Sequence, residues 1–484
     1  MDKKFSMNPN RLVQFLQKSP KDFTHEDIVR YCVENNVEFV NFHYCGWDGK
    51  LKTLNFVLNS QAHLEEILAA GERVDGSSLF PFIEAGKSDL YVMPRLSTAF
   101  LNPFSEVPAV DFLCSYLNRD GEPFESSPQY ILHKANEAFK QQTGLQMETM
   151  GELEYYIIGD AEELYQVPDQ RGYHASKPFC KYADLRTEAM RLIAQCGGLI
   201  KYGHSEVGNF TQDGKNYEQN EIEFLPTNIE DAADQLVLAK WVMRQLAYEY
   251  GVELTFAPKI TTGKAGSGMH VHCKFSSLDG NANPLFQASG SESVSEAFKK
   301  AIAGFMMAGT SLPAWGNPHP LSFQRLVPHQ EAPTSLCWSF SNRSALVRVP
   351  LGWSFMPEYS YKQTFEWRAS DAFADMYLLM AALCCAARYG FESAEANAVA
   401  EKTYVGLGVN IHDASNEALL NSLEQLPASC AEAGDELEKD RSIYTDKGVF
   451  SDALVNYQIK FLKAFKQIDA SEMSAAVKES INNG

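Results

Sequence analysis

Apolar and polar residues follow distinct helical and strand spacings in the first part of the chain. Residues 9–35 carry apolar side chains at helical spacing, and Thr24 followed three residues later by Asp27 is typical of a helix start. The segments 37–44 and 51–58 alternate as strands do, and an Asp-Gly pair in the turn between them favours a hairpin. These elements predict a small domain built around a sheet.

A second run of elements follows a stretch rich in prolines and turn residues. This stretch, between residues 103 and 128, precedes a helical segment at 129–143, so we predict domains at 1–120 and 121–484. Further expected strands are 151–159, 220–225, 268–275, 345–351 and 363–369, and further expected helices are 183–197 and 229–250. The fold class predicted from this pattern is α+β.

Composition narrows the class of protein. Apolar residues at 45% and charged residues at 21% are ordinary for a soluble globular chain. A net charge of −20 without a basic stripe makes nucleic acid an unfavourable partner. The apolar run 376–387 falls short of the roughly 20 residues that span a bilayer, so it predicts a buried helix. Ten cysteines without C-x-x-C spacing indicate reduced core thiols and a cytoplasmic location.

Closely spaced carboxylates lie within apolar segments that are predicted to be strands. Glu152 and Glu154 lie two apart, so both side chains point to one face of the expected strand. Alone, such a pair is typical of a solvent-exposed face. Glu221 and Glu223 repeat the spacing on another expected strand, and Glu206 precedes them. The repetition favours a site in which these glutamates together bind metal ions, and this site is called the basin below.

Two histidines extend this pattern. His270 and His272 also lie two apart, after a glycine turn that begins at Gly266 and lets backbone approach a ligand closely. A single imidazole among carboxylate oxygens suits Mg²⁺ or Mn²⁺, whereas a structural zinc site requires thiolates or more imidazoles. The segment therefore strengthens the prediction of a divalent-cation site.

Four arginines lie within apolar segments farther along the chain: Arg325, Arg343, Arg348 and Arg368. Guanidinium groups bind carboxylate and phosphate oxygens two at a time, although internal salt bridges to the glutamates would also explain them. Metal ions beside buried arginines suit a site that handles a polyphosphate and a carboxylate. The chain has no Walker-type phosphate loop, so any use of ATP requires another architecture.

The motifs in chain order resemble those of one family. They are Val74-Asp-Gly-Ser-Ser-Leu, Gly151-Glu-Leu-Glu-Tyr, His204-Ser-Glu-Val, Gln219-Asn-Glu-Ile, Gly266-Ser-Gly-Met-His-Val-His, Arg325-Leu-Val-Pro with Glu331-Ala-Pro, Asn342-Arg-Ser-Ala-Leu-Val-Arg-Val-Pro and Glu366-Trp-Arg. Together they resemble the glutamine synthetase family, bacterial type I, from about residue 35 to the tail. The resemblance implies an N-terminal β-grasp domain, a larger catalytic domain, and stacked subunit rings, a dodecamer of two hexamers with active sites between subunits.

The resemblance also implies roles for individual residues. The ligands of one metal ion would be Glu154, Glu206 and Glu221, and those of the other Glu152, His270 and Glu366. The residues that hold ATP would be His272, Arg343 and Arg348, and those that contact the substrate Gly266, Arg325, Arg368 and Tyr173. The catalytic residues would be Arg343, the flap residue Glu331, which takes a proton from the amine, and Asp75 at the amine site.

The implied reaction is ATP-dependent ligation of ammonia to the γ-carboxylate of glutamate through γ-glutamyl phosphate. Its product is glutamine, which places the enzyme in nitrogen assimilation in the cytoplasm. Glutamate, ammonium and ATP would be the bound partners, together with two or more Mg²⁺ or Mn²⁺ ions. Arginines and metal ions that share the phosphoryl charge would supply the main catalytic stabilisation.

The chain departs from the family pattern in places that concern the amine. The aspartate expected in the first hairpin is Gly46 here. Asp48, two residues later, would face the same way on a strand and could substitute if the turn is remodelled. Lys264 and Ala265 stand where the family has Asp-Asn. A polar insertion between Glu206 and Glu221 predicts a surface loop that leaves both ligands in place.

Two other functions stay open. A ligase on the same scaffold could use a larger amine, because Gly46 would enlarge the pocket. A catalytically silent structural or regulatory relative is the second alternative. Complete sets of expected metal ligands and arginines argue against the silent relative, and no motif for modification by AMP is recognisable.

Overall fold

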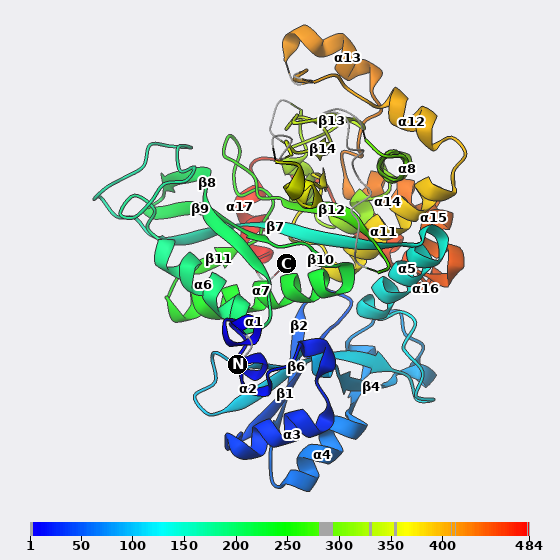
Figure 1. The fold of residues 1–484 in the computed structure, drawn as a ribbon. Coiled ribbons are helices and arrows are strands. Elements are labelled where there is room, and N and C mark those ends of the chain that lie inside the picture. The colour runs from blue at the N-terminus through cyan, green and yellow to red at the C-terminus, as the bar shows by residue number, and fades with distance from the viewer. Residues whose placement is uncertain are drawn as a thin grey trace.

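Two sheets, one in each half of the chain, organise the fold (Figure 1). The computed structural model describes residues 3–279, 294–328, 332–352, 356–407, 409–411, 413–481 and 483. The smaller sheet lies at one end of the molecule and the larger sheet lies beyond helix α7 (Ile229–Glu249), which runs between them (Figure 1).

The N-terminal sheet has the order β2-β1-β6-β4-β3, with β5 paired to β6. Its strands are β1 (Phe39–Cys45), β2 (Leu51–Val57), β3 (Glu72–Asp75), β4 (Asp89–Pro94), β5 (Phe100–Leu101) and β6 (Ala109–Leu117). The helices beside it are α1 (Lys3–Ser6), α2 (Arg11–Leu16), α3 (His25–Glu34) and α4 (Gln61–Ala70). Thr24 and Asp27 form the expected capping box at the start of α3. Parallel pairing of β1 with β6 at the centre of this sheet confirms the β-grasp prediction.

The larger sheet has the order β13-β14-β15-β12-β7-β9-β8, and β10 and β11 also pair with β7. Its strands are β7 (Leu145–Asp160), β8 (Ile200–Gln212), β9 (Lys215–Phe224), β10 (Thr227–Asn228), β11 (Glu253–Thr255), β12 (Met269–Ser277), β13 (Trp338–Phe340), β14 (Val347–Val349) and β15 (Phe365–Trp367). Alternation along β7 directs Gly151 and Leu153 toward Leu236 of α7, in the main core. The face of β7 that carries Glu152 and Glu154 is therefore the face turned away from α7.

The remaining helices surround this sheet. They are α5 (Pro128–Thr143), α6 (Ala183–Gln195), α8 (Glu296–Met307), α9 (Pro313–Gly316), α10 (Pro320–Arg325), α11 (Met376–Glu392), α12 (Ala396–Lys402), α13 (Glu417–Ser422), α14 (Cys430–Lys439), α15 (Arg441–Thr445), α16 (Asp452–Ala464) and α17 (Met473–Glu479). The apolar run 376–387 lies in α11 and is buried almost throughout, as expected of a core helix. Within the described residues, no helix is both long and apolar enough to cross a membrane.

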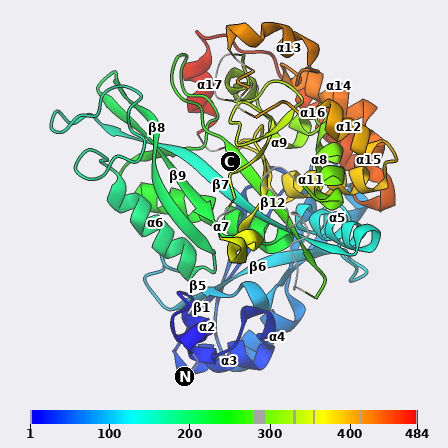
Figure 2. The ribbon, with the colours of Figure 1, turned by 45° about the horizontal axis from the view of Figure 1, so that its top comes forward.

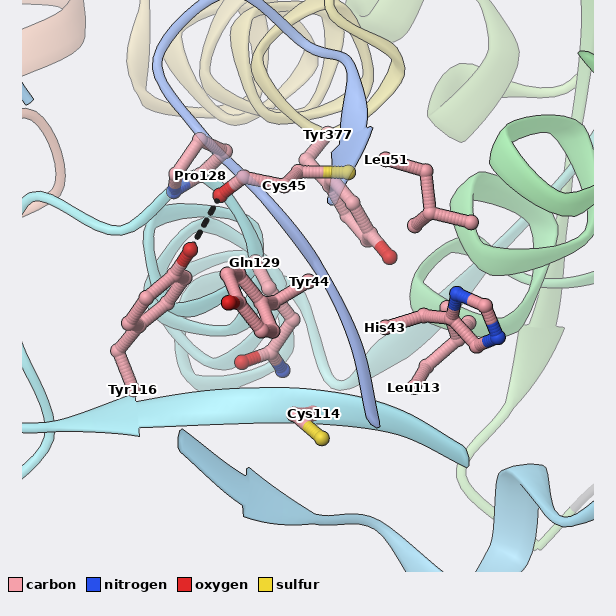
Figure 3. Close-up of a pocket in the computed structure, with 10 residues that line it drawn as sticks. All are labelled: His43, Tyr44, Cys45, Leu51, Leu113, Cys114, Tyr116, Pro128, Gln129 and Tyr377. Carbon is pink, nitrogen blue, oxygen red and sulfur yellow. Dashed lines mark hydrogen bonds between the residues drawn. The ribbon is translucent and has the colours of Figure 1, made fainter. Parts of the chain in front are cut away.

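The two domains meet in a tightly packed junction (Figure 3). Arg95 forms two hydrogen bonds of 2.7 Å with Asp234 of α7, and the ring of His43 packs against Trp241 of the same helix. A cavity of only about 10 Å³ lies between β1, β6, α5 and α11, and beside it the Tyr116 hydroxyl donates to the carbonyl oxygen of Cys45. This volume holds about one water molecule, so little space is left between the domains. The Arg95–Asp234 bonds and the contact of His43 with Trp241 hold the N-terminal domain against α7.

The insertion after Glu206 is not the surface loop expected from the sequence. Strands β8 and β9 continue through it as a paired ribbon, which runs out to one side of the molecule in Figures 1 and 2. Asp213 and Gly214 close the ribbon with positive φ angles of 51° and 73°, as a two-residue hairpin turn requires. Strand pairing gives the inserted backbone groups the hydrogen bonds that a loop would leave to water.

The contact between α8 and α11 provides a test of the packing. A methyl group on Gly304 would lie 2.0 Å from the carbonyl oxygen of Ala386, so Gly304→Ala should force the helices apart. Overpacking of this kind costs about 1–3 kcal/mol, and we expect a lower midpoint of thermal unfolding, measured by calorimetry. Gly86→Ala is the matched control because its methyl group would meet no atom within 4 Å. Equal midpoints for both variants would contradict the close helix contact.

Candidate active site

Strands β7 and β9 place four glutamates on one face in two opposed pairs. Glu152 lies directly opposite Glu223, and Glu154 lies directly opposite Glu221. Like charges in such positions destabilise a sheet unless cations compensate them. The predicted clustering of strand carboxylates is therefore present, and it demands compensation from neighbouring strands or from bound ions.

Strand β12 supplies two imidazoles to Glu152. Nδ1 of His270 lies 3.0 Å from one carboxylate oxygen of Glu152, and Nε2 of His272 lies 2.8 Å from the other. Burial by itself favours the neutral acid, but these imidazoles outweigh it and hold the pKa of Glu152 well below its usual range. Nδ1 of His270 is also 3.5 Å from Glu366. Glu152, His270 and Glu366 thus offer ligand atoms that lie within 4.8 Å of one another.

Two arginines bracket Glu366 on the other side. Arg348 and Arg368 each donate to a different oxygen of Glu366, at 2.7 and 2.6 Å. Burial raises the pKa of Glu366, but the charges of Arg368 and of the two histidines together outweigh burial, and the pKa falls below its ordinary value. The Nε atoms of both arginines are buried and have no hydrogen-bond partner among the residues that the structure describes. Such spare donors fit the oxygen atoms of a phosphate or carboxylate ligand.

A second group of ligand atoms lies along β8 and β9. His204, Glu221 and Glu223 have ligand atoms within 4.8 Å of one another, and Nε2 of His204 is 3.2 Å from Glu221. Nδ1 of the same ring lies 3.6 Å from Glu206, so His204 bridges two of the expected ligands. Burial, and then the charges of the surrounding glutamates, raise the pKa of Glu221 well above its ordinary value. A divalent cation would relieve this crowding.

Glu154 instead belongs to the wall of an adjacent cavity. The backbone N–H of Gly268 donates to it at 2.6 Å, and it lines a cavity of about 220 Å³ with the predicted substrate residues Gly266, Arg325 and Arg368. A side chain on Gly266 would place its Cβ 2.7 Å from the carbonyl oxygen of Pro258, so only glycine fits there. The volume suits a ligand the size of an amino acid.

Sequence reasoning missed one basic residue of this cavity. Lys259 is buried in the wall and donates to the backbone oxygen of Lys264 at 2.6 Å. Burial, and secondarily Arg325, lowers the pKa of Lys259. The sequence feature that could have indicated it is a lysine within the apolar segment that follows β11. With Arg325 and Arg368 it makes the cavity cationic, so the cavity suits an anionic ligand.

The other predicted residues are dispersed. Tyr173 is exposed, and the centre of its ring lies 5.6 Å from that of His204. Partial burial, and then the charge of Glu206, raise the pKa of its hydroxyl, and the charge of Arg343 opposes this shift. Asp75 lies in the N-terminal sheet and accepts hydrogen bonds from Ser77 and Ser78. Glu331 lies outside the described residues. The functional assignments of all these residues stay predictions.

The donors fit the groups expected at this site. Carboxylate oxygens with one imidazole suit Mg²⁺ or Mn²⁺, and the unpartnered Nε atoms of Arg348 and Arg368 suit phosphate oxygens. A β-grasp domain joined to a sheet with this basin defines an α+β protein whose side chains could hold divalent cations beside anionic ligands.

Comparisons with known proteins place the chain within this class. Residues 36–119 match the family model "Glutamine synthetase, beta-Grasp domain", and residues 125–481 match "Glutamine synthetase, catalytic domain". The chain belongs to the glutamine synthetase family. It is 30% identical to a glutamine synthetase of Thermotoga maritima over 86% of this chain and 90% of the relative. It is 29% identical to one of Mycolicibacterium smegmatis over 90% and 94%.

Solved structures share the fold. A cryoEM glutamine synthetase of Plasmodium falciparum superposes with a TM-score of 0.78 and 19% identity, over 93% of this chain and 98% of that one. A structure titled "Apo GmaS without ligand" gives a TM-score of 0.74 and 18% identity, over 94% and 96%. At these identities the likeness extends to the fold alone.

The raised pKa of Glu221 makes a prediction about metal binding. A raised pKa lets Glu221 keep its proton to a higher pH, and a carboxyl group must lose that proton to become a ligand, so metal binding should release protons and tighten as pH rises. Calorimetric titration with Mn²⁺ in buffers of different ionisation enthalpy measures this release. Glu221→Gln should reduce it. A binding heat independent of the buffer would contradict the prediction.

Proposed function

We propose that the protein is a glutamate–ammonia ligase that uses ATP to form glutamine through γ-glutamyl phosphate in the cytoplasm. The family is ATP- and divalent-metal-dependent. One observation carries the proposal: the Glu152, His270 and Glu366 group adjoins a cationic cavity, because His270 belongs to both and Arg368 lines the cavity while donating to Glu366. A phosphate donor and a carboxylate acceptor bound in these two places would meet at their boundary.

Individual residues would then have defined tasks. Arg325 and Lys259 would hold the glutamate carboxylates in the cavity, and the backbone at Gly266 would let the substrate approach closely. Arg348 and Arg368 would donate their spare N–H groups to the phosphate oxygens. By resemblance to the family, one metal ion would be held by Glu154, Glu206 and Glu221. The other would be held by Glu152, His270 and Glu366, whose ligand atoms lie within 4.8 Å of one another. Bound divalent cations would neutralise phosphate charge and favour phosphoryl transfer.

The proposed reaction has two steps. An oxygen of the γ-carboxylate attacks the terminal phosphorus of ATP, and the bond to ADP breaks. Ammonia then attacks the carbonyl carbon of the γ-glutamyl phosphate, the bond from that carbon to the phosphate oxygen breaks, and the nitrogen loses a proton. Glu331 is the proposed acceptor of that proton. Fixed arginines at the transferred group lower the barrier because they need no reorganisation during the reaction.

We further propose that neighbouring subunits complete the site in a ring, as a dodecamer of two hexamers. Helix α7 and the sheet separate the N-terminal domain from the basin of its own chain, because Arg95 holds that domain on Asp234 of α7. Asp75 and the tip of the first hairpin could therefore reach a basin only in another copy. Head-to-tail contacts of this kind close into rings.

A ligase for a larger amine is the second candidate, favoured by the first hairpin. Residues 46–49 form a turn rather than a strand, so the alternation expected to align Asp48 with position 46 does not apply. Asp48 is paired with Lys52 at 2.9 Å. A Cβ at Gly46 would lie 3.2 Å from Asp48 Oδ1, so this turn has little room for another side chain. The amine site thus lacks the family's aspartate at its usual place.

The test is phosphate release from ATP with glutamate and a panel of amines. We expect release that depends on ammonium, and Glu366→Gln should lower it at least about 100-fold, because even an indirect partner of a metal ligand is worth roughly 10–100-fold. Glu34→Gln, on the exposed end of α3, is the matched control. Release only with larger amines would favour the second candidate. Absence of ATP binding by calorimetry would favour a silent relative.

If each active site is shared between two subunits, two inactive variants with changes in different domains should complement each other. Glu366→Gln removes function from the basin and Asp75→Asn from the N-terminal domain, so each variant alone should be inactive. Co-expressed in equal amounts, they should form some intact sites and recover about one quarter of the wild-type rate. Co-expressed Glu366→Gln and Arg348→Gln should recover nothing, because both changes affect the same domain. Absence of recovery in the first pair would contradict sites shared between subunits.

A further inference from the structure

A β-bulge lies in strand β8 opposite Glu223 of β9. Ile200 pairs with Phe224, and the next pair is Tyr202 with Glu223, so Lys201 is an extra residue in β8. In a regular strand, Lys201 and Tyr202 would point to opposite faces. A bulge sets two residues against one on the partner strand and redirects a side chain. Here it allows both residues to reach Glu223.

Both oxygens of Glu223 are engaged by this bulge. Nζ of Lys201 lies 2.6 Å from Oε2, and the Tyr202 hydroxyl donates to Oε1. The Lys201 ammonium also lies 4.9 Å from the centre of the Tyr202 ring, within the range of a cation–π contact. The side chain of Glu223 is only 7% exposed, so the pair is shielded from water on the side of the carboxylate.

Glu221 has a different environment two residues earlier on the same strand face. Its ion-pair partner in the described part of the chain is the imidazole of His204, at 3.2 Å. No lysine or arginine of that part lies within 4.0 Å of Glu221 or Glu154. Glu223 therefore has a lysine of the same chain as its counter-ion, whereas Glu221 and Glu154 have no such counter-ion among the described residues.

We propose that Lys201 is the built-in counter-ion of Glu223 and that it limits the basin to two divalent cations. This inference rests on the proposed metal-dependent function. The ligand atoms of Glu223, Glu221 and His204 already lie within 4.8 Å of one another, the same spacing as in Glu152, His270 and Glu366. Without the ammonium group, Glu223 could therefore hold an additional divalent cation that shares Glu221 with one of the two proposed ions. Because Lys201 is part of the chain, it neutralises Glu223 without exchanging with solution.

Mn²⁺ stoichiometry tests the proposal. Equilibrium dialysis of the purified full-length protein against Mn²⁺, with electron paramagnetic resonance of the free ion, gives the number of ions bound per chain. We expect two for the wild type and three for Lys201→Met. Lys201→Arg keeps the positive charge and should bind two. The double variant Lys201→Met with Glu223→Gln removes the site of the additional ion and should return to two.

The possible outcomes separate this inference from the proposed function. Three ions on the wild type, or two on Lys201→Met, would overturn the role of Lys201 and leave the two-metal function intact. A wild type that binds no Mn²⁺ would remove the proposed function itself. Lys201→Gln repeats the test if the methionine variant does not fold, as judged by circular dichroism.

Discussion

Repulsion between Glu152 and Glu223, and between Glu154 and Glu221, is the constraint on which the catalytic sheet depends. Each pair faces directly across the β7–β9 ladder, where like charges oppose strand pairing. Neighbouring strands supply the compensation: β12 brings imidazoles, β14 and β15 bring guanidinium groups, and β8 brings an ammonium group. The remaining excess of negative charge lies around Glu221, where burial and then the neighbouring glutamates raise the pKa of this carboxyl group well above its ordinary value.

The same arrangement divides the sheet into a reactive face and a structural face. Residues that alternate with the glutamates pack on α7, and the N-terminal domain is fixed to that helix by Arg95 and Asp234. The chain therefore keeps its own N-terminal domain away from its own basin. A site that needs both domains must draw them from two copies, which connects the packing of one helix to the proposed ring assembly.

Sequence reasoning succeeded where spacing alone fixes geometry. Residues two apart on a strand share a face, so Glu152 with Glu154 and His270 with His272 could be placed before the fold was known. It failed where backbone irregularity changes that rule. Asp48 lies in a turn, and Lys201 lies in a bulge, so simple alternation describes neither. The insertion after Glu206 also formed strands, because its two halves could pair with each other.

The sequence by itself determined the family and its β-grasp and catalytic domains, and it predicted a set of residues that could bind metal and phosphate, because these follow from residue type, order and local spacing. Tertiary structure alone decided which of these residues share a site. The grouping of Glu366 with His270 across β12 and β15, the entry of Lys259 into the cavity wall, and the pairing of Lys201 with Glu223 depend on strand register and packing. Such contacts join residues that are distant in the chain or displaced by a bulge, and local periodicity carries no information about them.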